Sequence, residues 1–220
     1  MGSQNASDWM NVGRKKGILL DFMYQDKSMM YTMLQELGLP YPPFHIFKGS
    51  EMRMDAAASL FQSGKSFFCR LVPRNPAQER PYCLRLTSQT ELEEFLLPYH
   101  LDEYKEMQLV EKPEVFYTGS IIAQDQAPGI PGKCVVELVP GDGPNLFHGK
   151  RIPLTAFIEF GLLTIAPGTI SLERTLIYQA LNLVGGLKHP FPGYYEFEVW
   201  KENEIKFRNY QSPTTAYAQL

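Results

Sequence analysis

The order of the short apolar segments is the feature that most limits the fold of this 220-residue chain. Two helical patterns, at 28–38 and 51–64, come before a pair of strand patterns at 66–87. A third helical pattern follows, and the rest of the chain consists mostly of strand patterns, interrupted by one long helical pattern at 169–186. Strands joined by short turns, with few helices between them, favour antiparallel sheets with helices on one side. The sequence therefore predicts an α+β fold.

Local signals indicate where several helices begin and end. Ser88 stands three residues before Glu91, and this capping-box pattern predicts a helix that begins directly after Ser88. Gly38, followed by Pro40, predicts the C-terminal end of the first helix, and Gly185 predicts the end of the long one.

Composition argues against several classes of protein. The formal net charge of −3 gives no general attraction to nucleic acid or to anionic membranes. No apolar run reaches the roughly 18 residues of a membrane-spanning helix, and the first residues lack the apolar core of a signal peptide. The opening MGSQNAS fits the N-myristoylation pattern, and MGS is also common as a cloning remnant.

The three cysteines indicate a reducing compartment. Cys69, Cys83 and Cys134 are an odd number at wide spacing, and each lies in an apolar, strand-like segment. This pattern is typical of free, buried thiols rather than of a disulfide framework. With no signal for export, the sequence predicts a cytoplasmic location.

Two arginines lie in the middle of apolar strand patterns. Arg70 is in SFFCRLVP and Arg85 is in PYCLRLTS. A buried guanidinium needs an anionic partner, and its planar fork suits a phosphate or a carboxylate. Both arginines are therefore candidates for binding phosphate. The alternative is that they face water from a half-exposed sheet.

The last predicted hairpin, 193–210, carries two acids followed by two further polar residues. Glu196 and Glu198 are two residues apart, and Arg208 and Asn209 follow on the second strand. Alternate residues of a strand share a face, so the two carboxylates lie side by side. Neighbouring carboxylates repel each other unless a cation is present, and Mg²⁺ prefers oxygen ligands. The hairpin is a candidate magnesium site, and the alternative is a solvated strand face with lysines nearby.

The segment PGDGPNLFHGKRIP is rich in glycine but lacks the pattern of a phosphate-binding loop. We expect a hairpin or a loop that faces substrate, with Asp142 and His148 as its polar groups. No motif of a serine or cysteine nucleophile or of a zinc hydrolase is present in the sequence.

Taken in order, these segments resemble the ATP-grasp family. LQELGLPYPPFHIF is similar to the helix, turn and strand at the start of that family's N-lobe. SFFCRLVPR and PYCLRLTSQTELEEFL resemble its N-lobe strand pair and the helix after it, and EMQLVEKPE resembles the hinge strand. VFYTGSIIA and KCVVELVPGDGPNLFHGKRIP resemble the C-lobe strands, closest in style to the nucleotide-binding half of phosphoenolpyruvate synthase-like enzymes. GYYEFEVWKENEIKFRNY resembles the last hairpin.

The resemblance implies a two-lobed, ATP-grasp-like arrangement of antiparallel sheets, with a lobe boundary near residue 112. It divides the chain into an N-terminal extension, an N-lobe, a C-lobe and a C-terminal tail, at 1–27, 28–112, 113–211 and 212–220. It also implies ATP and Mg²⁺ as cofactors. The residues implied are Arg70 and Arg85 for the phosphates, Leu109, Val110, Glu111 and Lys112 for adenine, and Glu196, Glu198 and Asn209 for the metal.

Two functions follow from this resemblance. The first is an ATP-dependent ligase or phosphotransferase that acts on a carboxylate-like acceptor. The second is a catalytically inactive ATP-grasp-like module that binds a partner protein or nucleic acid, with Tyr194, Tyr195 and Tyr217 as contact residues. Three departures from the family favour the second: RNPAQERP has no glycine, the last motif reads RNY, and no α/β domain precedes the first helix.

Overall fold

The computed structural model describes residues 30–52, 57–75, 78, 80–123, 134–143, 151–159, 162–165, 169–186 and 192–211. These residues belong to two compact units, each built on one antiparallel sheet with few helices. The α+β class predicted from the sequence is therefore confirmed. The N-terminal extension, the C-terminal tail, His148 and Tyr217 lie outside the described residues.

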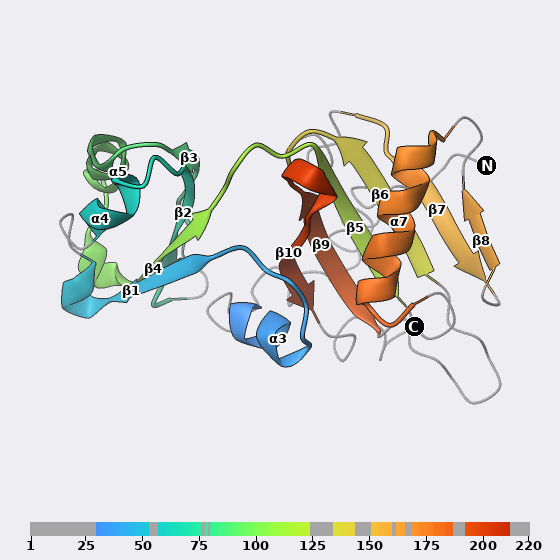
Figure 1. The fold of residues 1–220 in the computed structure, drawn as a ribbon. Coiled ribbons are helices and arrows are strands. Elements are labelled where there is room, and N and C mark those ends of the chain that lie inside the picture. Colours follow the sequence, from blue (N-terminus) through green and yellow to red (C-terminus); the bar gives the residue numbers. More distant parts are fainter. Residues whose placement is uncertain are drawn as a thin grey trace. The chain divides into compact units, whose positions relative to one another are not determined.

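The four-stranded unit contains residues 42–114, and its strand order is β1-β4-β2-β3 (Figure 1). The strand pair predicted at 66–87 is confirmed as the antiparallel pair of β2 and β3. The elements are β1 (Phe44–Lys48), η2 (Gly49–Glu51), α4 (Ala58–Phe61), β2 (Phe67–Pro73), β3 (Tyr82–Leu86), α5 (Gln89–Leu96), η4 (Leu101–Glu103) and β4 (Tyr104–Glu111).

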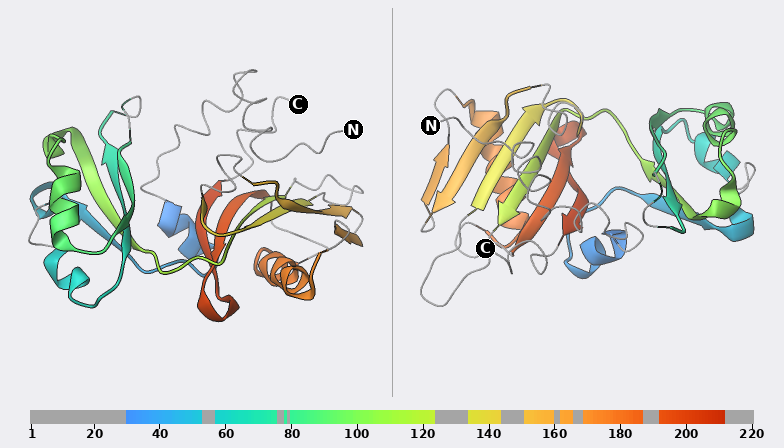
Figure 2. Two further views of the ribbon diagram at one scale, coloured as in Figure 1. Left: turned by 90° about the horizontal axis from the view of Figure 1, so that it is seen from above. Right: turned by 180° about the vertical axis from the view of Figure 1, so that it is seen from behind.

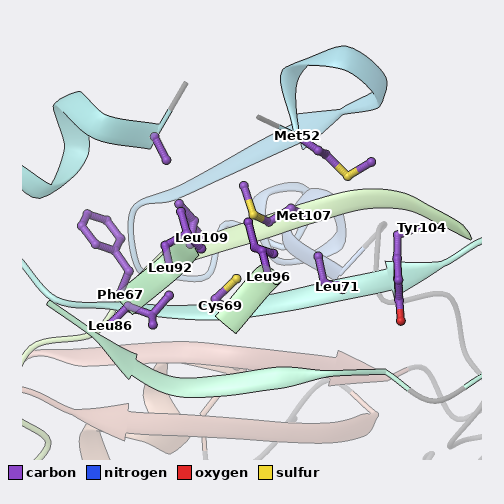
Figure 3. Packing of buried hydrophobic residues seen from close by; sticks show 11 residues of the cluster. Met52, Phe67, Cys69, Leu71, Leu86, Leu92, Leu96, Tyr104, Met107 and Leu109 are labelled. Carbon is purple, nitrogen blue, oxygen red and sulfur yellow. The ribbon is translucent and has the colours of Figure 1, made fainter. Parts of the chain in front are cut away.

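One face of this sheet forms the core of the unit. Alternate residues of β2 and β4, such as Cys69 and Leu109, point to this face and are fully buried. Leu92 and Leu96 of α5 pack against them, and Met52 belongs to the same cluster (Figure 3). The opposite face of the same strands is therefore where polar side chains must be sought.

Helix α5 begins as its capping box predicts. The Ser88 hydroxyl accepts a hydrogen bond from the Glu91 amide at 3.2 Å, and the Glu91 carboxylate accepts one from the Thr87 amide at 2.6 Å. This second hydrogen bond lowers the pKa of Glu91. By contrast, the helix predicted at 51–64 is only partly formed among the described residues, as the short α4 that ends before Gly64.

The six-stranded unit contains residues 30–41 and the described residues from 115 onward, in the strand order β10-β9-β5-β6-β7-β8 (Figure 1). The backbone amide of Phe207 donates to the carbonyl of Pro40 at 2.7 Å, so the first helix joins this unit. The elements are α3 (Met30–Glu36), β5 (Tyr117–Ala123), β6 (Cys134–Pro140), β7 (Leu154–Glu159), β8 (Leu162–Ile165), α7 (Ser171–Leu183), β9 (Gly193–Val199), η5 (Lys201–Asn203) and β10 (Ile205–Gln211).

Strands β7 and β8 were not predicted from the sequence. Their segments are short and mix apolar and polar residues without clear alternation, so they give a weak strand signal. The long helix α7 and the last hairpin, β9 with β10, are confirmed. No described helix is long and apolar enough to cross a membrane.

The two faces of the six-stranded sheet differ sharply in polarity. Helix α7 lies against one face (Figure 2), and its buried side chains include Leu176 and Leu181. The strand residues Ile121 and Phe197 are fully buried, and their register positions place them on one face of the sheet. On each strand, the residues next to these point to the opposite face, and many of them are polar. The helix therefore covers the apolar face, and the polar side chains gather on the opposite face.

Gly119, in the centre of β5, tests this packing. A Cβ atom added there would fall within 2.6 Å of a ring atom of Phe197 and 2.8 Å of the carbonyl oxygen of Glu137. We expect Gly119→Ala to lower the free energy of unfolding by about 1–3 kcal/mol, because the core has no space for the methyl group. Urea denaturation measures the effect. Phe197→Leu should recover part of the loss in the double variant, and strictly additive effects would contradict the predicted contact.

Candidate functional site

The acidic face is the polar face of the six-stranded sheet, and Ser120, Glu137, Glu196, Glu198 and Asn209 define it. Ser120 lies in register with Glu196 on β9 and with Glu137 on β6, so it stands between two carboxylates. Asn209 lies opposite Glu196 on β10. Directly paired residues of an antiparallel sheet point to the same side, with Cβ atoms about 5 Å apart. Four neighbouring strands therefore bring two carboxylates, a hydroxyl and an amide together.

Glu137 and Glu196 both act on the buried hydroxyl of Tyr194. The Ser120 hydroxyl donates to Glu137 at 3.3 Å, and the Glu137 side chain is buried. Burial raises the pKa of Tyr194 well above its ordinary value, and the charges of Glu196 and Glu137 raise it further. The two carboxylates therefore lie close enough to Tyr194, and so to each other, for their charges to interact.

Glu198 has a different environment on the same face. Its Oε2 atom lies 3.7 Å from Nε of Arg208 and accepts a hydrogen bond from the indole nitrogen of Trp200 at 3.2 Å. Both side chains of the ion pair are largely buried, with 6% of Glu198 and 13% of Arg208 exposed. The structure thus separates the two acids that the sequence had grouped together, because among the described residues only Glu198 of the two forms an ion pair with an arginine.

The donor set on this face suits a hard cation. Carboxylate, amide and hydroxyl oxygens are the ligands that Mg²⁺ prefers, and the ion usually takes only one or two carboxylates together with phosphate oxygens. Across the described ranges, no three acidic, histidine or cysteine side chains converge on one point. Glu196, Glu137 and Asn209 would therefore hold magnesium only together with ligand or water oxygens.

Gln211 adds one more oxygen to this face. It lies opposite Tyr194 in the register, is 3% exposed, and its side-chain oxygen has no hydrogen-bond partner in the described structure. A buried acceptor without a donor costs free energy. The orphaned oxygen is therefore consistent with a site that a ligand or a hydrated cation completes.

The four-stranded unit carries a polar row on the face opposite its core. Arg70 lies in register with Gln108, and Glu106, two residues earlier on β4, lies on the same face. The Gln108 amide donates to Glu106 at 2.7 Å, and Nζ of Lys48 lies 3.9 Å from the same carboxylate. Gln108 is fully buried, and the half-buried guanidinium of Arg70 lies over the ring of Phe68 at 5.1 Å. This row gives Arg70 a polar setting.

The segment expected to meet adenine is built into the sheet. Leu109 and Val110 are fully buried. The Glu111 amide donates to Pro43 and the Lys112 amide to Ser66, each at 2.8 Å, and the Ser66 hydroxyl donates to the Lys112 carbonyl. The Glu111 carboxylate forms an ion pair with Lys65 at 2.7 Å. These backbone amides are engaged, so a base would be recognised through side chains or the remaining carbonyls.

The other predicted site residues are placed as follows. Arg85 is exposed on β3, and its charge acts on Glu91; this matches the alternative of a surface-facing arginine. Asp142 is half-buried just after β6. Tyr195 is buried in the apolar face and contacts Phe207, so it is a core residue.

Several site residues were missed by reasoning from sequence. Glu137 and Ser120 lie in the middle of apolar strands, and Glu106 and Gln108 alternate with apolar residues in β4. A single acid inside an apolar strand such as CVVELVP is the signal that would have identified Glu137. The pairing of Ser120 with both carboxylates required the strand order, which the sequence does not contain.

The cysteines provide a test of burial in both units. Cys69 and Cys134 are buried as predicted, whereas Cys83 is half-buried. Burial raises the pKa of Cys134 to about 12, and burial also raises that of Cys69. The thiolate form of Cys134 is therefore scarce at pH 8. We expect an aromatic disulfide reagent to label only Cys83 rapidly in the native protein, and Cys83→Ser to remove that phase. Rapid labelling of Cys134 would contradict this burial.

Comparisons with known proteins give similarity at the level of solved structures. The sequence matches no protein-family model and no curated protein. D-alanyl-alanine synthetase A from Vibrio cholerae is similar at TM-score 0.49 and 11% identity, over 86% of this chain and 55% of that chain. Carboxyaminoimidazole ribonucleotide synthase from Aspergillus clavatus, complexed with ATP, is similar at TM-score 0.49 and 11% identity, over 86% and 44%. D-alanine-D-alanine ligase from Coxiella burnetii is similar at TM-score 0.49 and 12% identity, over 89% of this chain and 49% of that chain. The chain spans about half the length of these proteins.

Proposed function

We propose that this protein is an ATP-grasp-type ligase or phosphotransferase that uses ATP and Mg²⁺ and acts on a carboxylate-like acceptor. The observation that carries the proposal is the acidic face, where Glu196, Ser120 and Glu137 lie side by side on three neighbouring strands. Oxygen donors that gather on a largely buried face suit a magnesium ion that also binds phosphate. The resemblance of the ordered segments to ATP-grasp proteins supports the same conclusion.

Within the six-stranded unit, the proposal assigns a role to each polar side chain of the acidic face. Glu196, Glu137 and Asn209 would hold the metal, which when bound would neutralise charge on the phosphate oxygens. The Ser120 hydroxyl orients Glu137 through its hydrogen bond. Glu198 remains a proposed part of the site, held by Arg208 and Trp200. On this proposal, the acidic face would contribute to phosphoryl transfer by positioning the phosphate groups and by stabilising their charge.

The four-stranded unit would supply cationic and base-binding groups. Arg70 is the proposed phosphate contact, because it is half-buried and lies opposite Gln108 in the sheet. The segment from Leu109 to Lys112 is the proposed contact for the base, and Arg85 would add positive charge from the surface. We further propose a cytoplasmic location, with which the free cysteines agree.

Trapping of an acyl phosphate tests the reaction directly. The full chain is incubated with ATP, Mg²⁺, hydroxylamine and a panel of amino acids and other carboxylic acids. A ligase of this class should form ADP and a hydroxamate in equal amounts with at least one acid, because hydroxylamine captures the activated carboxylate. If nucleotide binds but no acid yields hydroxamate or a phosphorylated product, the chain is a non-catalytic nucleotide-binding module instead.

A further inference from the structure

Arg208 lies on the acidic face because β10 contains an irregularity. The register of β10 against β9 shifts between Phe207 and Asn209, so Arg208 is an extra residue in this strand. Lys206 pairs with Glu198 before the shift, and Asn209 pairs with Glu196 after it. Bulges of this kind redirect a side chain and are frequent beside active sites. Here the bulge lets Arg208 and Asn209, neighbours in sequence, both reach the polar face.

The contacts of Glu198 make it a poor metal ligand. Its Oε2 atom already faces the Arg208 guanidinium and the Trp200 indole nitrogen, and Glu198 is buried. A divalent cation at this carboxylate would lie beside a guanidinium, and the two positive charges would repel each other in a setting that screens charge weakly. Glu196, by contrast, forms no ion pair with any described lysine, arginine or histidine. The two acids therefore suit different tasks.

We propose that Arg208 binds a phosphate oxygen of the ligand and that Glu198 is its positioning residue, whereas Glu196 and Glu137 hold the single metal ion. The inference rests on the proposed function and refines it, because it removes Glu198 from the metal site. A guanidinium binds phosphate through a rigid fork of N–H donors, and a buried carboxylate beside it fixes the direction of that fork. The acidic face would thus combine an exchangeable metal ion with the fixed positive charge of Arg208.

Lys206 offers a matched control for Arg208. It lies on the same strand and face, but its Nζ atom is 2.6 Å from Glu204 and lies over the Trp200 ring. Lys206→Met therefore removes the same charge as Arg208→Met without touching the ion pair of Glu198. Arg208→Lys keeps the charge and loses the planar fork. Circular dichroism and thermal unfolding of each full-length variant show whether the fold is retained.

Two calorimetric titrations of the full chain test the proposal: Mn²⁺ alone, and a non-hydrolysable ATP analogue with Mg²⁺. Arg208→Met should bind the analogue about tenfold more weakly or worse while binding Mn²⁺ at least as tightly as the wild type. Arg208→Lys should fall between them, and Lys206→Met should match the wild type. Glu198→Gln should weaken analogue binding and leave Mn²⁺ binding unchanged.

The outcomes separate this proposal from the function on which it rests. Wild-type binding of the analogue together with equal binding by Arg208→Met would overturn the role of Arg208 alone. Loss of Mn²⁺ binding in Glu198→Gln would return Glu198 to the metal site and overturn the division of tasks. A wild-type chain that binds no analogue would overturn both proposals.

Discussion

Glu196→Gln should abolish most metal-dependent nucleotide binding and leave the fold as stable as before, or more stable. The substitution removes one negative ligand, and interactions with charged groups contribute roughly 1.5–3 kcal/mol, which corresponds to about 10- to 100-fold in affinity. The same substitution removes one of two negative charges that act on the buried Tyr194 hydroxyl. Without a bound cation these charges repel each other, so their relief stabilises the free protein.

The measurement combines Mn²⁺ titration with urea denaturation of the metal-free protein. Glu137→Gln should behave in the same way, because Glu137 flanks Ser120 from the opposite strand. Glu202→Gln is the matched control, since Glu202 is exposed in the turn of the same hairpin. Unchanged Mn²⁺ affinity in Glu196→Gln, or a clear loss of stability without loss of binding, would show that these carboxylates have a structural role only.

Reversal of charge at Arg70 should have the second large effect. Arg70→Glu replaces a half-buried guanidinium with a carboxylate on the face that already carries Glu106, so phosphate would meet two negative charges. We expect nucleotide affinity to fall about 100-fold, as the loss of a charge-assisted contact and the new repulsion combine. Analogue titration of the full chain measures this.

The design needs a variant that keeps the fold and a second arginine for comparison. Arg70→Gln removes the positive charge without replacing it by a negative one, and this variant should bind the ATP analogue about tenfold more weakly than the wild type. Arg85→Glu should change affinity by much less, because Arg85 is exposed and its charge acts on Glu91. Equal losses at Arg70 and Arg85 would support the sequence-based prediction that both hold phosphate. No loss at Arg70 would exclude the polar row as a phosphate site.

Much of the fold could be predicted from the sequence because its signals are local. The capping box at Ser88, the alternation in β9 and the glycines after α7 each depend on neighbours within a few residues. The hairpin of β7 and β8 was missed because short segments without alternation resemble loops. Local pattern thus identified the elements whose periodicity is strong and failed where periodicity is weak.

The candidate site was harder to predict because its members meet across strands. Alternation correctly placed Glu196 and Glu198 on one face, but it could not show that a bulge brings Arg208 to Glu198. Glu137 enters the site only because β6 lies beside β5, and strand order is a property of the whole sheet. In physical terms, burial and charge depend on tertiary neighbours, which a linear pattern does not specify.

The central claim is that the acidic face makes nucleotide binding depend on magnesium. Its most direct test is calorimetric titration of the full chain with a non-hydrolysable ATP analogue, with Mg²⁺ and then with a chelator present. The account predicts binding with Mg²⁺, markedly weaker binding with chelator, and loss of the difference in Glu196→Gln. Binding that is equally tight in both conditions, or no binding at millimolar analogue, would contradict it.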